Sequence, residues 1–592
     1  MKHIITERVA ALRKVMLSQH VDAFIVPSTD PHSGEYVPAH WECRKWISGF
    51  TGSAGTAVIT ADQCGLWTDS RYFLQAEEQL EGTEYTLFKD RLPETPSIPQ
   101  WLGSQLPPHG RIGIDGTVNT LDETEMLKSA VAAYGLEVVS IPDPFEVLWT
   151  DRPSIPLNRP FILPLCYAGE SCQSKLARIR ESIHGNGAEG VLLSALDEIA
   201  WTLNLRGDDV HCNPVFVSYL LITANDATLF IHPQKLTEET RQYLAANNIN
   251  TQDYNQVTEA LLNYKGRNIQ ISDSANYALY QAASACTTVI RKPSPALCLK
   301  AIKNETEIEG FRSAMKRDGA VMVKFLIWLK NAVRNGEETE KSIDRKLFEF
   351  RAQQDLFKGI SFDTIAGYQE HGAIVHYEAT EESASTLKPE GLLLLDSGAQ
   401  YLDGTTDITR TIALGPVTEE QKKDYTLVLK GFISLSMAEF PYGTCGTQLD
   451  AFARQFMWKA GINYGHGTGH GVGHFLNVHE GPHQFRMNHV PALLLPGMTI
   501  TNEPGIYKAG RHGVRTENTM LIVQSQHTEF GDFYKFEPLT LCPIDKEAIH
   551  AEMLTDEEKG WLNKYHRQVY ELLCPMLNAE EQAWLKQATS AI

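Results

Sequence analysis

The sequence lacks the features that place a chain in a membrane or on a nucleic acid. Its longest apolar stretches, around Phe325–Leu329 and Leu392–Leu395, are far shorter than the roughly 20 apolar residues of a membrane span. The first residues carry charges where a signal peptide would have an apolar segment. Acidic residues outnumber basic ones by 73 to 53, giving a formal net charge of −20, which disfavours charge-driven binding to nucleic acid or anionic lipid. We therefore expect an intracellular, cytoplasmic protein that binds neither.

Paired cysteine motifs are also missing. Ten cysteines are scattered from Cys43 to Cys574, with no CxxC pair and no regular spacing. Such a pattern indicates reduced, mostly buried thiols in the cytoplasm rather than a disulfide framework. The apolar share of 43% and the charged share of 21% are those of an ordinary globular protein. Because 592 residues are too many for one hydrophobic core, we expect several domains.

The first 300 residues contain a faint internal repeat. Each copy has an amphipathic helix, a strand, a tryptophan and a second apolar strand in the same order (residues 8–16, 23–28, 46 and 55–61; then 174–183, 190–194, 201 and 219–224). We predict two copies of one α/β domain, at 1–155 and 156–300, joined in a proline-rich stretch. Chance similarity of two α/β folds is the alternative. Neither copy has a dense cluster of ligand-type residues, so we assign both an architectural role.

A third domain is predicted from residue 301 to residue 541. Asn304 and Glu307 have the spacing of a helix capping box, and apolar residues then recur on one helical face (Ile308, Phe311, Met315, Met322, Phe325 and Leu329). From Gly391 onward the pattern changes to short strands, which predicts an α+β domain.

The last segment, 542–592, is predicted to be a helical extension. Thr555 and Glu558 form a second capping-box pattern, followed by an interrupted apolar stripe. We expect this stripe to pack on the third domain; a contact between two copies of the chain is the alternative.

Residues that bind hard cations occur in order within the third domain (Asp396, Asp407, His470, Glu503 and Glu517). Two unit charges about 4 Å apart repel by about 4 kcal/mol at an effective dielectric constant near 20, so four buried carboxylates need counter-charge. Two divalent ions would balance them, held roughly 3.5 Å apart by bridging carboxylates. Oxygen ligands with one imidazole favour manganese, and cobalt and zinc can also occupy such a set of ligands.

The two aspartates lie on either side of a predicted turn, which sets the register of the strands that carry them. Asp403-Gly404 has the composition of a tight turn, and a two-residue turn there would place Asp396 opposite Thr411. For both aspartates to reach one metal pair, we predict a wider loop or a bulge at Ser397-Gly398.

Three histidines, His466, His470 and His474, are spaced four apart in a glycine-rich run. On a helix this spacing would suggest a zinc site. Each interior helical glycine costs about 1 kcal/mol relative to alanine, however, so a strand or loop is predicted, in which glycine lets the backbone approach a neighbour. The glycine spacing does not fit a dinucleotide-binding fingerprint either. We favour a functional site over structural histidines.

Several segments together resemble the metal-binding blocks of the pita-bread metallopeptidases, and within them the long, three-domain X-prolyl aminopeptidases (aminopeptidase P). The main ones are residues 395–401, 404–410, 465–473, 478–482, 502–505 and 514–518, with further likeness at 67–72 and 373–377. The resemblance implies two related creatinase-like α/β domains, a pita-bread α+β catalytic domain and the helical extension. It also implies an enzyme that removes the first residue from peptides with proline at the second position, usually with manganese and often as a homodimer.

Site roles follow from the resemblance, residue by residue. Asp396 would bind one metal, His470 and Glu503 the other, and Asp407 and Glu517 would bridge them. The remaining positions match residues that assist the reaction or contact the substrate (His376, His466 and His479) or lie near the proline pocket (Tyr507 and Arg515). Two departures, Asn502 and Thr516, stand where aspartate and isoleucine are common, and neither is expected to disturb ligation.

The mechanism we infer uses water activated between the two metals. Glu503 would take its proton, and His376 or His479 would donate a hydrogen bond to the developing negative charge. The nearest rival is a prolidase, which splits Xaa-Pro dipeptides with the same ligands. Methionine aminopeptidase would need little of the first 300 residues. A metal-free peptide-binding module, or creatinase-type hydrolysis without metal, is disfavoured because all five ligand positions are filled.

Overall fold

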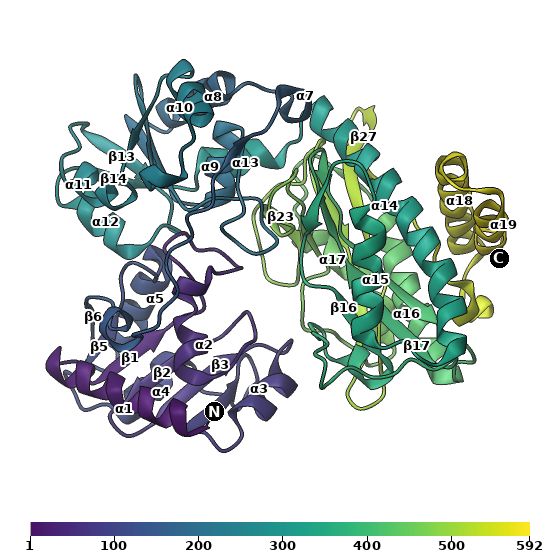
Figure 1. The fold of residues 1–592 in the computed structure, drawn as a ribbon, viewed down its shortest axis with the longest axis horizontal. Coiled ribbons are helices and arrows are strands. Elements are labelled where there is room, and N and C mark those ends of the chain that lie inside the picture. Colours follow the sequence, from purple (N-terminus) through teal and green to yellow (C-terminus); the bar gives the residue numbers. More distant parts are fainter. Residues whose placement is uncertain (1) are drawn as a thin grey trace. The chain divides into compact units, whose positions relative to one another are not determined.

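The computed structural model describes residues 2–592, which form two compact units (Figure 1). Among the described residues, the N-terminal unit contains 2–162 and Glu170–Leu297, and the C-terminal unit contains Leu163–Gly169 and Cys298–Ile592. The four-domain division expected from the sequence, with its boundaries at residues 155, 300 and 541, stays a prediction.

The first half of the N-terminal unit is a six-stranded sheet in the order β4-β3-β2-β1-β5-β6. Its strands are β1 Ala23–Val26, β2 Thr56–Thr60, β3 Cys64–Thr68, β4 Tyr85–Lys89, β5 Arg111–Ile114 and β6 Glu137–Ser140. Its helices are α1 Lys2–Ser18, α2 Cys43–Ser48, α3 Phe73–Leu80, α4 Ile98–Gln105, α5 Leu121–Ala132 and α6 Phe145–Leu148. Helix α1 forms because Ile5, Val9, Leu12 and Met16 recur on one face, and all four are buried.

The second half repeats this topology, with the strand order β12-β11-β10-β8-β13-β14. Its strands are β8 Gly190–Leu193, β10 Tyr219–Thr223, β11 Ala227–Phe230, β12 Ile249–Gln252, β13 Asn268–Ile271 and β14 Thr288–Arg291. Its helices are α8 Cys172–Gly185, α9 Leu196–Leu203, α10 Glu238–Ala246, α11 Val257–Leu262 and α12 Tyr277–Ser284. Corresponding strand pairs run in the same sense in both sheets, for example β1 with β5 and β8 with β13, both parallel. The predicted duplication is therefore confirmed.

The C-terminal unit has mixed helices and mostly antiparallel strands, as the sequence predicts. Its long helices are α14 Glu305–Ala332, α15 Glu340–Ala352, α16 Glu419–Ser436 and α17 Gly446–Lys459. Helix α14 begins at the predicted capping box, since Asn304 accepts from Glu307 N at 3.0 Å and Glu307 accepts from Asn304 N at 3.0 Å.

The strands of this unit form several sheets around the ligand residues. Three small sheets are β15-β18-β19, β16-β17-β20 and β25-β26, and a six-stranded sheet has the order β21-β28-β27-β24-β22-β23. Their bounds are β15 Phe357–Ile360, β16 Ile365–Tyr368, β17 Leu392–Ser397, β18 Ala399–Tyr401, β19 Gly404–Thr405, β20 Ile408–Ala413, β21 Glu439–Pro441, β22 Gly469–Gly471, β23 Glu480–Phe485, β24 Thr499–Asn502, β25 Gly505–Lys508, β26 His512–Arg515, β27 Asn518–Thr528 and β28 Gly531–Pro538.

The C-terminal extension forms α18 Asp556–Leu573 and α19 Ala579–Ala588, at the outer side of this unit in Figure 1. Leu562, Tyr565 and Val569 of α18 are buried in one apolar cluster with Phe432 of α16. The predicted packing of the stripe on the preceding domain is thus confirmed. Among residues 2–592, no helix combines the length and the apolar character needed to cross a bilayer.

Candidate metal centre

Asp396 and Asp407 lie on one hairpin. Strands β17 and β20 pair with Asp396 opposite Thr409, and the same register continues to Tyr401 opposite Gly404. The turn is therefore Leu402-Asp403, one residue earlier than predicted, and neither a wider loop nor a bulge is used. Asp407 then stands two residues from the partner of Asp396, which makes the two aspartates diagonal neighbours on one face.

The turn was misassigned because Gly404 serves packing rather than a left-handed conformation. A Cβ atom on Gly404 would lie 3.1 Å from Ala314 Cβ and 3.3 Å from Phe311 Cα, so glycine lets the hairpin approach α14. Gly404 is also absent from the residues with positive φ in the described chain.

His470 sits in β22, so the prediction of a strand or loop for the glycine-rich run is confirmed. A Cβ atom on Gly469 would lie 1.9 Å from Thr501 O, which is the close backbone approach that the glycines allow. His470 Nδ1 lies 2.9 Å from Gly471 O. This carbonyl can only accept, so Nδ1 carries the proton and Nε2 is left as the ligand atom.

The two glutamates converge on the same region. Glu503 follows β24, and its Oε1 lies 3.5 Å from His470 Nε2; the same nitrogen is 3.4 Å from Asp407 Oδ2. Glu517 lies between β26 and β27 and its Oε2 accepts a hydrogen bond from Thr409 Oγ1 at 2.7 Å. One ligand atom from each of Asp407, His470 and Glu517 lies within 4.8 Å of the others.

The electrostatics of the cluster are those of crowded like charges. Burial, reinforced by Asp407 and Asp396, raises the pKa of Glu503 to about 7 against the opposing effect of His470. Burial and Asp407 also raise the pKa of Glu517, and burial raises the pKa of Asp396 despite Arg515. Burial opposes the charged form of His470, but Asp407 and Glu503 outweigh it and raise the imidazole pKa to about 9. Each shift has the sign expected where carboxylates are buried together without enough positive charge.

The donor set fits hard divalent cations. Asp396 Oδ1 is buried and has no hydrogen-bond partner among the described residues, an arrangement that usually costs free energy unless a ligand is bound. The hydrogen bond to Gly471 O orients His470 with Nε2 toward Asp407 and Glu503. Four carboxylates and one imidazole are suitable ligands for manganese and similar ions.

A hydrogen-bonded chain extends from this cluster to His466. Arg515 Nη2 donates to Asp396 Oδ2 at 2.6 Å, and Arg515 Nη1 donates to Tyr507 Oη at 2.7 Å. Tyr507 Oη lies 2.8 Å from His466 Nε2, and His466 Nδ1 lies 2.7 Å from Gly467 O. Since the carbonyl accepts from Nδ1, Tyr507 must donate to Nε2. The structure thus brings together three of the predicted substrate-contact residues.

The two other predicted histidines approach from different segments. The His479 ring packs edge-on against the His470 ring, with centroids 4.3 Å apart. His376 lies in a turn after a short helical segment, η5 Gln369–Ala373. The residue before it, Val375, accepts a hydrogen bond from Arg515 Nη2 at 3.5 Å.

Sequence reasoning missed the polar residues that hold these segments. Asp450 and Arg454 of α17 form a buried ion pair at 2.6 Å, and Arg454 Nη2 donates to His466 O at 2.8 Å. Their spacing of four on one helix was the available signal. Glu340 is buried and accepts hydrogen bonds from Tyr377 Oη at 3.0 Å and from His371 Nδ1 at 2.9 Å. Glu340 is the first residue of α15, and nothing in the local sequence distinguishes it from other glutamates at helix starts.

The departure at Asn502 has a structural explanation. Asn502 Nδ2 donates to Phe432 O at 2.8 Å and to Ser436 Oγ at 2.9 Å. A carboxylate could not donate to the Phe432 carbonyl. The amide therefore anchors β24 to α16 without adding a further negative charge near Glu503.

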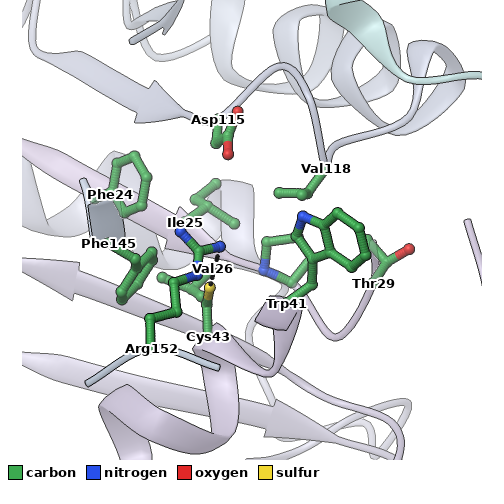
Figure 2. Close-up of a pocket in the computed structure, with 11 residues that line it drawn as sticks. Phe24, Ile25, Val26, Thr29, Trp41, Cys43, Asp115, Val118, Phe145 and Arg152 are labelled. Atoms are coloured by element: carbon green, nitrogen blue, oxygen red, sulfur yellow. Dashed lines mark hydrogen bonds between the residues drawn. The ribbon is translucent and has the colours of Figure 1, made fainter. Parts of the chain in front are cut away.

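A small hollow in the N-terminal unit is a poor substrate site. Figure 2 shows its lining, with the Arg152 guanidinium beside the Cys43 sulfur, 3.6 Å from it. The free space is about 10 Å³, which is room for about one water molecule. The lining residues are Phe24, Ile25, Val26, Pro27, Thr29, Trp41, Cys43, Asp115, Val118, Phe145 and Arg152.

The fold and the carboxylate-rich centre define a metal-dependent hydrolase of the pita-bread class. The profile described as "Metallopeptidase family M24" matches residues 309–524, and "C-terminal region of peptidase_M24" matches residues 532–592. Two profiles described as "Creatinase/Prolidase N-terminal domain" match residues 8–148 and 151–307.

Full-length relatives narrow this class. The chain is 42% identical to "Probable Xaa-Pro aminopeptidase P" of Laccaria bicolor, covering 99% of this chain and 94% of the relative. It is 40% identical to "Xaa-Pro aminopeptidase 1" of Dictyostelium discoideum, covering 99% and 96%. The chain belongs to the metallopeptidase family M24, in the branch of these Xaa-Pro aminopeptidases.

Solved structures agree with this assignment. The X-prolyl aminopeptidase of Caenorhabditis elegans, described as a cytosolic enzyme with a di-nuclear active site, superposes with a TM-score of 0.95 at 34% identity and covers 99% of this chain and all of its own. An Xaa-Pro dipeptidase from Bacillus anthracis covers only 63% of this chain, with a TM-score of 0.52 at 26% identity and 99% of its own length covered. The di-nuclear site of the first relative supports two divalent metals in this family.

Proposed function

We propose that this protein is a two-metal aminopeptidase that hydrolyses the bond between the first residue and proline at the N-terminus of peptides. The observation that carries the proposal is the cluster of four carboxylates and His470, in which Asp396, Asp407 and Glu517 are buried and Glu503 and His470 are mostly buried, in a chain that matches Xaa-Pro aminopeptidases over 99% of its length. Asp396 would bind one metal, His470 and Glu503 the other, and Asp407 and Glu517 both. Retention of all five ligands argues against a metal-free peptide-binding module.

The proposed reaction depends on the protein residues around the metals. Bound at this site, two divalent cations would lower the pKa of a water molecule so that hydroxide is available near neutral pH. Glu503 would accept a proton from that water, and the hydrogen bond from Thr501 Oγ1 to Glu503 Oε1 at 3.3 Å orients the carboxylate. His479 and His376 are the candidate donors to the negative charge that develops on the substrate carbonyl oxygen.

Substrate recognition is assigned to the side of the site bearing Tyr507. The bond before proline has no N–H, so recognition depends on ring shape and on the charged N-terminus of the peptide. Arg515, Tyr507 and His466 form a rigid polar chain that ends at Asp396. We propose that this chain borders the proline pocket and fixes His466 beside the substrate.

Prolidase activity is the second candidate, because prolidases use the same kind of ligands. The prolidase-type structure matches 63% of this chain, whereas the aminopeptidase structure matches 99%. The duplicated α/β domain thus supports the aminopeptidase.

We further propose manganese as the native metal, a homodimer as the assembly and the cytoplasm as the location. The boundaries at residues 155, 300 and 541 are proposed as domain limits.

The deciding experiment compares two substrates with the same first residues. Purified protein is dialysed against chelator, reloaded with manganese, cobalt or zinc, and given an Xaa-Pro dipeptide or an Xaa-Pro-Xaa tripeptide. Release of the first residue from the tripeptide, at a higher kcat/KM than from the dipeptide, is expected. Cleavage of the dipeptide alone would identify a prolidase, and no metal-dependent cleavage of either would overturn the proposal.

A further inference from the structure

A buried charge cluster lies directly beside His479. Glu480, the first residue of β23, accepts a hydrogen bond on Oε2 from Lys300 Nζ at 2.9 Å and one on Oε1 from Lys303 Nζ. The three side chains are at most 1% exposed. Two ammonium groups therefore share one carboxylate in the protein interior, where an ion is stable only when it is paired and hydrogen-bonded.

The two lysines belong to the segment by which the chain enters the C-terminal unit. Lys300 lies in α13 Pro295–Ala301, and Lys303 Nζ also donates to Lys300 O at 3.0 Å. The backbone of the segment is fixed as well, since Lys303 N donates to Gly497 O at 2.9 Å and Ile302 forms a β-bridge with Met498. Met498 directly precedes β24, the strand that leads to Glu503.

Glu480 also contacts the strand that bears His470. Gly471 stands opposite Glu480 in the β22–β23 pairing, and a Cβ atom on Gly471 would lie 2.5 Å from Glu480 O. The backbone at Glu480 therefore sits close against the strand beside the metal ligand. His479 is the preceding residue, so its backbone adjoins this anchor, and its ring contacts the His470 ring.

A second imidazole borders the cluster. His483 Nε2 lies 2.7 Å from Thr499 O. Burial is the largest effect on His483 and lowers its pKa to about 4. The charges of Lys300 and Lys303 also lower the pKa, and the charge of Glu480 raises it. His483 is therefore neutral near pH 7, donates to the carbonyl and ties β23 to β24 on the other side of Glu480. The strand that follows His479 is thus held at two points.

We propose that Lys300, Lys303 and Glu480 are positioning residues for the reaction: this charge cluster holds His479 against His470 in the orientation needed to assist catalysis. The proposal rests on the proposed function, since it requires His479 to take part in the reaction. It also gives the connecting segment a role in the active site, because the segment supplies both ammonium groups.

The test uses Lys303→Met, which removes one charge and leaves Lys300 in contact with Glu480. Lys300→Met is the second variant and leaves Lys303 paired instead. With the manganese-loaded protein and an Xaa-Pro-Xaa tripeptide, we expect kcat to fall at least about tenfold and KM to change less than about threefold. The affinity of the metal-free protein for manganese, titrated by calorimetry, should change less than about threefold.

Lys430→Met is the matched control. Lys430 and Glu558 form another buried ion pair in the C-terminal unit, with the shortest distance at 2.6 Å, between α16 and α18. This variant should lower the melting temperature to a similar extent as Lys303→Met and leave kcat near the wild-type value.

A double-mutant cycle with His479→Ala separates positioning from a general structural effect. If the cluster acts through His479, Lys303→Met/His479→Ala will be no slower than His479→Ala alone. Multiplied losses in the double variant, unchanged kcat in both lysine variants, or a more than tenfold loss of manganese affinity would overturn the proposal. Absence of tripeptide cleavage by the wild-type protein would instead overturn the proposed function and the positioning role with it.

Discussion

Two sites of buried charge, one in each unit of this protein, are balanced differently. In the N-terminal unit, Asp209 and Lys235 form an ion pair whose side chains are at most 1% exposed, and Asp209 also accepts from Val217 N at 2.7 Å. In the C-terminal unit, Asp396, Asp407, Glu503 and Glu517 converge, and the positively charged or protonatable side chains paired with them are Arg515 and His470.

This difference distinguishes a structural charge from a functional one. A one-to-one pair satisfies the electrostatic needs of a fold within the chain itself. An excess of buried carboxylates does not, and the raised pKa values of Asp396, Glu503 and Glu517 reflect it. The balance is completed by cations from outside the chain, so the unbalanced cluster marks where the protein binds them.

Asp407→Asn tests the unbalanced cluster most severely. It removes a proposed bridging ligand, and we expect kcat/KM on an Xaa-Pro-Xaa peptide to fall at least about a thousandfold, or about 4 kcal/mol of transition-state stabilisation. Metal analysis should show fewer than two ions per chain. Asp403→Asn, in the turn of the same hairpin, is the control and should keep both metals. Two bound ions with intact cleavage in Asp407→Asn would contradict the two-metal site.

The stability of the metal-free protein should separate the two units. Asp209→Asn leaves Lys235 buried without its counter-charge, and we expect it to destabilise the N-terminal unit by about 3–5 kcal/mol. Asp407→Asn removes one negative charge from a cluster in which Asp407 raises the pKa of Glu503 and Glu517, so the metal-free variant should melt at or above the temperature of the metal-free wild type.

Melting curves in chelator and in saturating manganese measure this contrast. In saturating manganese the wild type should melt at a higher temperature than Asp407→Asn, the reverse of their order in chelator, because only the wild type gains the full binding free energy of the metals. If Asp209→Asn and Asp407→Asn lower the melting temperature equally in chelator, the metal-free carboxylate cluster has no destabilising excess of negative charge, and the contrast between the two sites is wrong.

Tyr507→Phe tests the polar chain without altering any charge. The variant loses the hydroxyl that accepts from Arg515 and lies 2.8 Å from His466. We expect kcat to fall about tenfold to thirtyfold, or about 1.4–2 kcal/mol, with both metals retained. Tyr442→Phe, at a side chain that is 61% exposed, should behave like wild type. If Tyr507→Phe instead loses metal, the Tyr507 hydroxyl helps to position the metal ligands.

The smallest expected effect is the contribution of the His371–Glu340 pair, in the C-terminal unit, to the pH dependence of stability. The hydrogen bond that His371 donates to the Glu340 carboxylate outweighs burial and raises the pKa of His371. The protonated imidazole is then favoured in the folded state, so its stabilisation is complete below the unfolded pKa near 6.5 and is lost as pH rises through the folded value. Its size should be at most about 1 kcal/mol.

Melting temperatures of wild type and His371→Gln between pH 6 and pH 9 measure this effect. The difference between the two proteins should be largest at pH 6 and shrink as the pH rises. A difference that grows with pH would mean that the folded state favours the neutral imidazole. Metal-loaded protein is used throughout, so that the ligand carboxylates do not titrate in the same range.

Much of the fold was predictable from local signals. The capping box at Asn304 and Glu307 and the apolar face behind it identified α14, because helix initiation depends on residues three apart. The duplicated domain was visible from the repeated order of helix, strand and tryptophan. The ligand residues were recognisable because their types and order restrict the chemistry.

The errors and omissions concern interactions between distant segments. Gly404 was interpreted as a turn residue, whereas α14 explains it: Ala314 Cβ lies 3.1 Å from where its Cβ would be. Glu340 and Lys303 were not singled out, since their partners Tyr377 and Glu480 are 37 and 177 residues away in the chain. Such partners have no local sequence signal.

The sequence by itself determined the residue types of the metal centre, the helix starts and the duplicated domain, because each depends on chemistry or on spacing within a few residues. The tertiary structure decided the register that makes Asp396 and Asp407 neighbours, the tautomer of His470, and the contacts that place His466 and His479. These depend on which backbone and side-chain groups meet across strands and helices, and burial makes each such contact strong enough to fix the geometry of the site.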